Sequence, residues 1–208
     1  MALSAGLILI GFMPAATLFV FQKALWMVLD SALALTLLLG FITAVLCASH
    51  CIRREMTNGT ALLLLSKPVS RFAFIAAKIA GIDAAMAVFA VIFCSAAVIM
   101  GMTTAGMLIF EDWGTFSYFA ILALCGLYGA AENYFRHTPF SARAVPALAI
   151  AMPLFALIVY FISATLQPLY DGPSYISLGR LIPALYLIFA ALMLIGTISA
   201  AFATKFSF

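Results

Sequence analysis

Six long stretches without a charged side chain constrain this chain more than any other feature of its sequence. They lie at residues 2–22, 31–52, 84–110, 113–131, 144–170 and 181–204. A helix needs about 18–20 apolar residues to cross roughly 30 Å of hydrocarbon, and each stretch reaches that length. Barrel strands would alternate apolar and polar residues over about ten positions, whereas these stretches are apolar on every side. We therefore predict an all-α, polytopic membrane protein with six transmembrane helices.

The composition agrees, because 67% of the residues are hydrophobic, only 8% are charged, and the mean hydropathy is +1.23. Soluble domains have about half apolar and about a quarter charged residues. Met1–Ser4 carries no basic residue, so we interpret the first stretch as a true span and not as a signal peptide. We expect residues 1–208 to form a single transmembrane domain. Its spans would cover about 3–22, 30–52, 79–106, 114–133, 144–166 and 182–203.

The basic residues predict how the spans are oriented. Eight of the ten would lie on one side of the membrane: Arg53, Arg54, Lys67, Arg71, Lys78, Arg136, Arg143 and Lys205. Only Lys23 and Arg180 would lie on the other side. The positive-inside rule places the side with eight, and with it both termini, in the cytoplasm.

The connection between the second and third predicted spans, residues 53–78, holds five of the ten basic residues. Its middle, Ala61–Leu65, is wholly apolar but too short to cross a bilayer. Two fates fit this pattern. The segment can lie on the membrane surface, with its basic flanks against anionic lipid, or it can dock on a cytoplasmic partner.

Local signals predict a short helix, an elbow and then a long helix within this connection. Asn58-Gly59 is a turn signal, and Thr60 can cap a helix that begins at Ala61. That helix must end near Lys67, because a residue before proline is pushed out of the helical region. A new helix, which becomes the third span, is then expected to begin at Arg71 after a cap at Ser70.

The same connection carries a distinctive residue pattern. Ile52-x-x-Glu55 is followed by Gly59-Thr60 and by "LLLLSKPVSR", with Phe74 and Lys78 further on. This pattern resembles the motif of type-2 ABC exporter permeases, and the similarity extends upstream through the second span. The resemblance implies a coupling loop at 53–78 that contains a coupling helix. Its partner-binding residues would be Arg54, Glu55, Gly59, Thr60, Leu63, Leu65, Ser66, Lys67, Pro68, Ser70 and Arg71.

The resemblance also implies a function and a set of partners. The chain would be the permease subunit of an ABC transporter, exporting an unknown substrate with ATP that a separate ABC ATPase subunit hydrolyses. It would form a homodimer or pair with a related permease, surrounded by membrane lipid and without nucleic acid. We expect it in the bacterial plasma (inner) membrane. No G-x-x-x-x-G-K-[ST] phosphate loop occurs, so the partner subunit would bind the ATP and this chain would need no cofactor.

Two alternatives stay open, a haem-exporter-like permease of cytochrome c maturation and a non-transporting membrane assembly or anchor protein. An intramembrane enzyme is disfavoured, because no polar cluster and no catalytic residue set is evident. No metal site is expected either. Cys47 and Cys51 lie one helical turn apart beside His50, but a metal needs three or four converging ligands.

A few residues inside the predicted spans call for a decision between packing and function. Asp83, near the cytoplasmic start of the third span, is either a functional intramembrane acid or a structural acid that pairs with Lys78. Pro14 and Pro153 should each kink a helix, as a hinge or merely to shape it. The small residues Gly126, Gly129 and Ala130 are interpreted as helix-packing positions.

Overall fold

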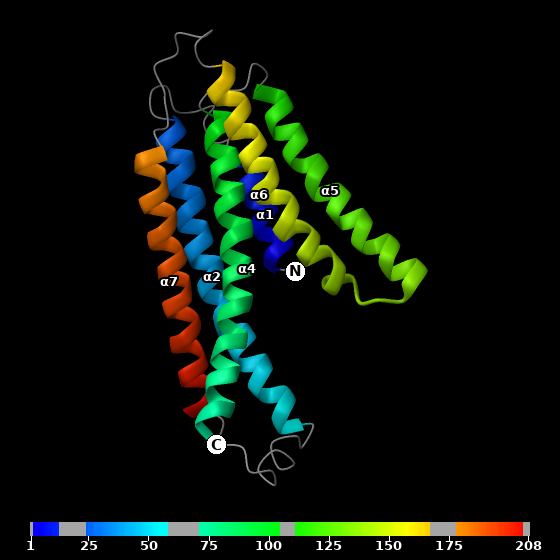
Figure 1. Ribbon diagram of the computed structural model, residues 1–208, viewed down its shortest axis with the longest axis vertical. Coiled ribbons are helices and arrows are strands. Elements are labelled where there is room, and N and C mark those ends of the chain that lie inside the picture. Colours follow the sequence, from blue (N-terminus) through cyan, green and yellow to red (C-terminus); the bar gives the residue numbers. More distant parts are fainter. Residues whose placement is uncertain (1, 13–23, 58–70, 105–110, 167–177, 206–208) are drawn as a thin grey trace. The chain divides into compact units, whose positions relative to one another are not determined.

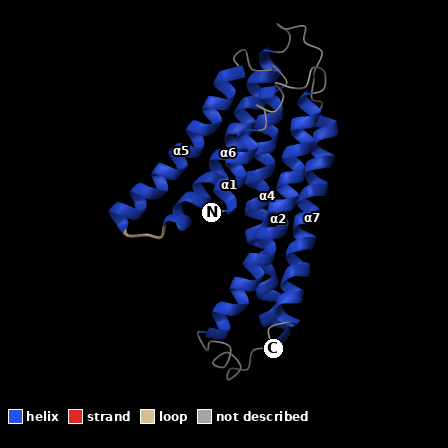
Figure 2. Ribbon diagram, turned by 180° about the vertical axis from the view of Figure 1, so that it is seen from behind, coloured by secondary structure: helices blue, strands red, loops and turns tan. Residues whose placement is uncertain are grey.

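The computed structural model describes residues 2–12, 24–57, 71–104, 111–166 and 178–205. These residues form six helices (Figure 1): α1 (Ala2–Phe12), α2 (Ala24–Thr57), α4 (Arg71–Thr104), α5 (Glu111–Arg136), α6 (Phe140–Leu166) and α7 (Leu178–Lys205). In the described ranges the chain contains no strand (Figure 2). The predicted all-α class is confirmed.

Five of these helices are long and apolar enough to cross a membrane. The candidate spans are Met27–Cys51, Ala76–Thr103, Gly114–Arg136, Phe140–Ile162 and Leu181–Ala203. Helix α1 is apolar but its described part is short, and the predicted first span continues into 13–22, outside the described residues together with Pro14. The chain is thus a polytopic membrane protein with five candidate spans, and the sixth span stays a prediction.

Helices α2 and α4 extend beyond the apolar segments that predicted them. Helix α2 continues through Arg53 and Arg54 to Thr57, and α4 begins at Arg71, the residue at which the sequence predicts a new helix. A helix does not need to stop where hydrocarbon ends, because its backbone hydrogen bonds remain satisfied in water. With 34 residues each, α2 and α4 are about 50 Å long.

Contacts within the chain divide it into two units. The first comprises Met1–Thr36 and Val91–Leu185, and the second comprises Leu37–Ala90 and Tyr186–Phe208. Helices α2, α4 and α7 contribute residues to both units.

In the first unit, α1 packs on α5 through a glycine and a buried hydroxyl. A Cβ atom on Gly11 would lie 2.6 Å from Cζ of Phe119 and 2.8 Å from Cε1 of Tyr118, so a larger residue would require these rings to move. The Tyr118 side chain is fully buried, and its O–H donates a hydrogen bond of 2.8 Å to the carbonyl oxygen of Leu7. A buried hydroxyl needs such a partner, so this bond satisfies Tyr118 and ties the two helices together.

Helices α5 and α6 form an antiparallel hairpin in the same unit (Figure 1). At Gly129 a Cβ atom would lie 2.8 Å from Cβ of Ala144, and Cβ is fixed to the backbone. The packing interpretation is therefore correct for Gly129. For Gly126 and Ala130 it stays a prediction, because within the described chain a Cβ atom on Gly126 would meet nothing within 4 Å and Ala130 is exposed. These two residues lie on faces of α5 that do not meet α6.

In the second unit, glycines again allow close contact. A Cβ atom on Gly40 of α2 would overlap Cδ2 of Leu192, a fully buried side chain of α7. On Gly196 of α7 it would lie 2.9 Å from Oδ1 of Asp83 and 3.2 Å from Cγ of Met86, both in α4. Small residues let membrane helices approach closely, so van der Waals contact can replace the weak hydrophobic driving force in lipid.

The buried serine and threonine hydroxyls in the described helices are satisfied by their own helix. Thr36 donates to the carbonyl of Ala32, and Thr103 to that of Met100, each at 2.8 Å. Ser95 does the same toward Ile92. Because these bonds stay within one helix, the hydroxyls do not converge on a shared site.

Prolines occur inside two helices, Pro146 and Pro153 in α6 and Pro183 in α7. Each lacks an N–H group and so removes one hydrogen bond from its helix. The helix nevertheless continues past Pro153 for more than three turns. The kink expected at this residue stays a prediction.

The pair Gly129 and Gly126 provides a test of the α5–α6 contact. Gly129→Ala should destabilise the protein by about 1–3 kcal/mol, because the helices must separate to admit the methyl group. Gly126→Ala, one turn away on the same helix, adds the same methyl group in open space and should be neutral or slightly stabilising. Thermal unfolding of both variants in one detergent compares them. Equal midpoints would show that the close contact at Gly129 is not formed.

Candidate functional site

The coupling loop predicted at 53–78 is described only at its two ends. Arg54 and Glu55 belong to the last turn and a half of α2, and Arg71 is the first residue of α4. Gly59, Thr60, Leu63, Leu65, Ser66, Lys67, Pro68 and Ser70 lie outside the described residues. The predicted coupling helix and elbow therefore stay predictions. The structure does describe α2 and α4, the two long helices that the loop would connect.

Asp83 is brought against α7. Its Oδ1 atom is buried beside Gly196 and has no hydrogen-bond partner among the described residues. The residue is seven positions, or about 10 Å, into the candidate span that begins at Ala76. The predicted pairing with Lys78 stays a prediction, and Asp83 stays a candidate functional acid whose carboxylate is close to the backbone of α7.

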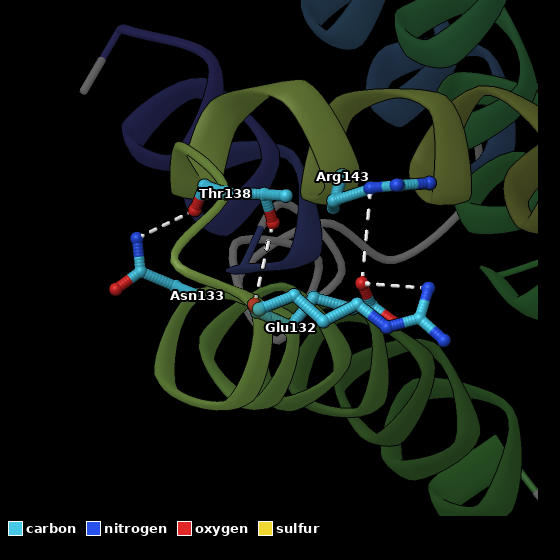
Figure 3. A network of polar contacts seen from close by, with 5 residues as sticks. Glu132, Asn133, Thr138 and Arg143 are labelled. Carbon is cyan, nitrogen blue, oxygen red and sulfur yellow. Dashed lines mark hydrogen bonds and ion pairs between the residues drawn. The ribbon is translucent and has the colours of Figure 1, made fainter.

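Polar side chains gather where α5 turns into α6, in a cluster that the sequence analysis did not find. We define the turn cluster as Glu132, Asn133, Arg136, Thr138 and Arg143. Figure 3 shows Glu132 and Asn133 on α5 facing Thr138 and Arg143 across the turn.

Backbone geometry builds this turn from only three residues, 137–139. His137 has φ of 53°, a left-handed conformation that commonly ends a helix, and its N–H donates to the carbonyl of Asn133 at 3.1 Å. Pro139 then disfavours a helical conformation at Thr138. The N–H of Ala142 donates to the carbonyl of Pro139 at 3.0 Å and starts α6.

Two side chains hold the turn closed. Nδ2 of Asn133 donates to the carbonyl oxygen of Thr138 at 2.8 Å, and Oγ1 of Thr138 donates to the carbonyl oxygen of Glu132 at 3.3 Å (Figure 3). These bonds satisfy backbone carbonyls that the end of α5 and the turn would otherwise leave to water. The positions of α5 and α6 at this end are thereby fixed.

One carboxylate faces two guanidinium groups in the turn cluster. Oε2 of Glu132 lies 3.7 Å from Nη1 of Arg136 and 3.8 Å from Nε of Arg143. The Glu132 side chain is only 16% exposed, whereas those of Arg136 and Arg143 are 67% and 44% exposed. Oε2 is buried and has no direct hydrogen-bond partner in the described part of the chain, so the attraction is between charges. The cluster carries a net charge of +1, with its positive groups outward.

Only part of this cluster can be predicted from the sequence. The spacing of Glu132 and Arg136, four residues apart on a helix, predicts an ion pair. The approach of Arg143 could not be read from spacing, because it depends on the three-residue turn that reverses the chain.

The described ranges contain no candidate metal-binding site. No set of three or more His, Cys, Asp or Glu side chains that could hold a metal ion occurs there. Cys47 and Cys51 lie on α2 as predicted by their spacing, and all four cysteines are free thiols.

Comparison with known families gives the chain its assignment. Residues 5–132 match the model of the family described as "ABC-2 family transporter protein". The match covers more than half of the chain and contains the whole motif from Ile52 to Lys78, and it ends at the first residue of the turn cluster. Comparison with curated proteins and with solved structures gave no match. By the length of the family match and the five candidate spans, this chain belongs to the ABC-2 transporter family, as a membrane component of the permease type.

Proposed function

We propose that this chain is the permease subunit of an exporter driven by ATP that a separate subunit hydrolyses. The observation that carries the proposal is the family match over residues 5–132, which includes the complete coupling motif. The identity of the substrate is left open, because the buried serine and threonine hydroxyls of the described spans bond within their own helices and mark no shared site.

The division of labour with an ATPase is supported by the sequence. The chain has no phosphate loop with which to hold the phosphates of ATP. A permease of this kind must therefore receive its energy through contact, and an apolar segment between two long helices is suited to that task. Helix α4 begins three residues after Pro68, so a displacement of the loop would be transmitted along a helix of about 50 Å.

The orientation we propose follows from helix connectivity and charge. If each of the helices α2, α4, α5, α6 and α7 crosses once, then the ends that carry Arg54, Arg71, Arg136, Arg143 and Lys205 share one side. The positive-inside rule makes this side cytoplasmic. The coupling loop would then face the compartment in which ATP is available.

The proposed assembly is a pair of permeases with ATPase subunits below them, in the bacterial inner membrane. A homodimer is the simplest form, because a single chain has too few spans to surround a large pathway, and a related permease would serve equally. Two alternatives from the sequence remain. A haem-exporter-like permease would differ from the proposed exporter in the substrate that it moves. A non-transporting anchor would differ in binding no ATPase.

The coupling loop generates the first prediction of this proposal. Leu63→Asp and Leu65→Asp should each reduce recovery of the ATPase subunit with a tagged chain, because a buried apolar anchor is replaced by a charge. Loss of such an anchor typically costs about 2 kcal/mol or more, which is a weakening of roughly thirtyfold. Glu55→Ala probes the acid of the motif, and we expect a smaller loss. Recovery is measured by co-purification with a co-expressed phosphate-loop ATPase, sought first in the reading frames adjacent to that of this chain.

Two controls accompany this experiment. The wild-type chain purified alone should not hydrolyse ATP, and the Asp variants should keep the same membrane insertion and thermal stability as the wild type. Full recovery of the ATPase with both Leu variants, together with normal coupled hydrolysis, would assign the loop to the membrane surface. Absence of any ATPase partner with the wild type would favour the anchor-protein alternative.

The proposed orientation gives a second prediction. Single cysteines introduced by Lys67→Cys and Gly172→Cys, in a chain whose four native cysteines are replaced by serine or alanine, should react from opposite sides of the membrane. An impermeant maleimide added to intact cells should label position 172 and not position 67. Labelling of both positions from outside, or of position 67 alone, contradicts the orientation.

A further inference from the structure

We propose that the turn cluster binds the headgroup of an anionic phospholipid, with Arg136 and Arg143 as the phosphate-binding residues. Three aromatic side chains at the same turn, Tyr134, Phe135 and Phe140, would anchor it at the membrane surface. The proposal depends on the chain being a membrane protein and is independent of its transport function.

The short turn places the cluster beside the ends of two candidate spans, where lipid headgroups are expected. The candidate spans on its two sides end at Arg136 and begin at Phe140. Only three residues connect them, and three extended residues reach about 10 Å at most. The turn therefore cannot project far from the bilayer. Arg143 belongs to the second span itself, so its guanidinium group must extend toward the headgroups to remain solvated.

Charge at this turn favours an anion. The buried Glu132 carboxylate can neutralise only one of two arginines, and both guanidinium groups lie within 4 Å of the same carboxylate oxygen. This arrangement holds two partly exposed cations around one carboxylate. A guanidinium group matches the oxygen atoms of a phosphate with two parallel N–H donors. Two of them held together present such donors to one phosphodiester group.

The two arginine side chains are oriented before any ligand binds. The Asn133 and Thr138 hydrogen bonds close the turn, and Glu132 orients both side chains from within it. A site that is ordered before binding loses less side-chain entropy when its ligand arrives. The buried acid thus serves as the positioning residue of the cluster, and the two arginines as its contacts.

The aromatic side chains point to lipid and not to a protein as the occupant. Tyr134 and Phe135 are 78% and 79% exposed and pack edge to face, with ring centroids 5.3 Å apart. Phe140 is also exposed on the other side of the turn. Aromatic rings prefer the boundary between headgroups and acyl chains, and these three lie where both spans meet that boundary. A cytoplasmic protein would have to reach into the headgroup layer to cover them.

Quenching of a single tryptophan by brominated lipids tests the proposal. Tyr134→Trp is introduced in a full-length chain that also carries Trp26→Phe and Trp113→Phe. The protein is reconstituted into vesicles of phosphatidylcholine with increasing phosphatidylglycerol, one or the other brominated. We expect phosphatidylglycerol to be preferred at the probe about fivefold, the effect of one net basic charge near the surface. Arg136→Gln with Arg143→Gln should reduce the preference to about onefold.

Matched variants separate a specific site from general attraction and from misfolding. Lys205→Gln removes one positive charge from the same proposed side but from α7, and should leave the preference at the probe unchanged. Arg136→Lys with Arg143→Lys keeps both charges but loses the paired N–H donors, and should retain only part of the preference. Glu132→Gln raises the net charge of the cluster to +2 but removes the group that orients the two arginines, so a positioned site predicts a weaker preference and general charge attraction a stronger one. Loss with Lys205→Gln, or retention with the double Gln variant, would overturn the proposal.

Two further measurements test whether the turn cluster binds free phosphate or a protein instead of a lipid. Inorganic phosphate at millimolar concentration should not abolish the preference, because a lipid headgroup is held at high local concentration in the bilayer; its abolition would indicate a site for free phosphate. Absence of quenching by either brominated lipid, with protection of the probe only when the ATPase subunit is added, would assign the turn to protein contact. Either result contradicts the proposal.

Discussion

The hydrocarbon interior offers no hydrogen-bond partner to a peptide group, and the rest of this structure depends on that constraint. Each spanning segment must pair its own N–H and C=O groups, and a helix does so within one segment. The hydroxyls of Thr36, Ser95 and Thr103 obey the same requirement by bonding to carbonyls of their own helices. Polar groups that bond locally contribute nothing to a shared site. Side chains of two helices meet instead in the turn cluster, at the ends of α5 and α6.

Contact between helices then rests on shape. Gly11, Gly40, Gly129 and Gly196 occupy positions where even a methyl group would meet a neighbour closer than van der Waals distance. In water such contacts would be secondary to the hydrophobic effect, but in lipid the surrounding tails are as apolar as the side chains. The glycines are accordingly the residues that bring α1 to α5, α5 to α6, and α2 and α4 to α7 within their respective units.

How much the sequence predicts depends on how local each feature is. The uncharged stretches locate five candidate spans, and Pro68 with the cap at Ser70 predicts the start of α4 at Arg71, because both signals are properties of a continuous segment. Gly126 and Gly129 were predicted alike, yet only one faces α6, since the facing side is set by the partner. The approach of Arg143 to Glu132 was missed for the same reason. The coupling residues from Gly59 to Ser70, which the family motif predicts, lie outside the described structure.

The hydrogen bond from Tyr118 to Leu7 has a consequence for movement within the first unit. A main-chain carbonyl in a helix already accepts one bond from its own turn, so this oxygen serves two donors at once. Sliding α1 by one residue along α5 would remove the acceptor from the fully buried hydroxyl and drive the rings of Tyr118 and Phe119 away from Gly11. The two helices are thereby locked in register. Any rearrangement during a transport cycle would carry the described part of α1 and the adjoining segment of α5 as one rigid body.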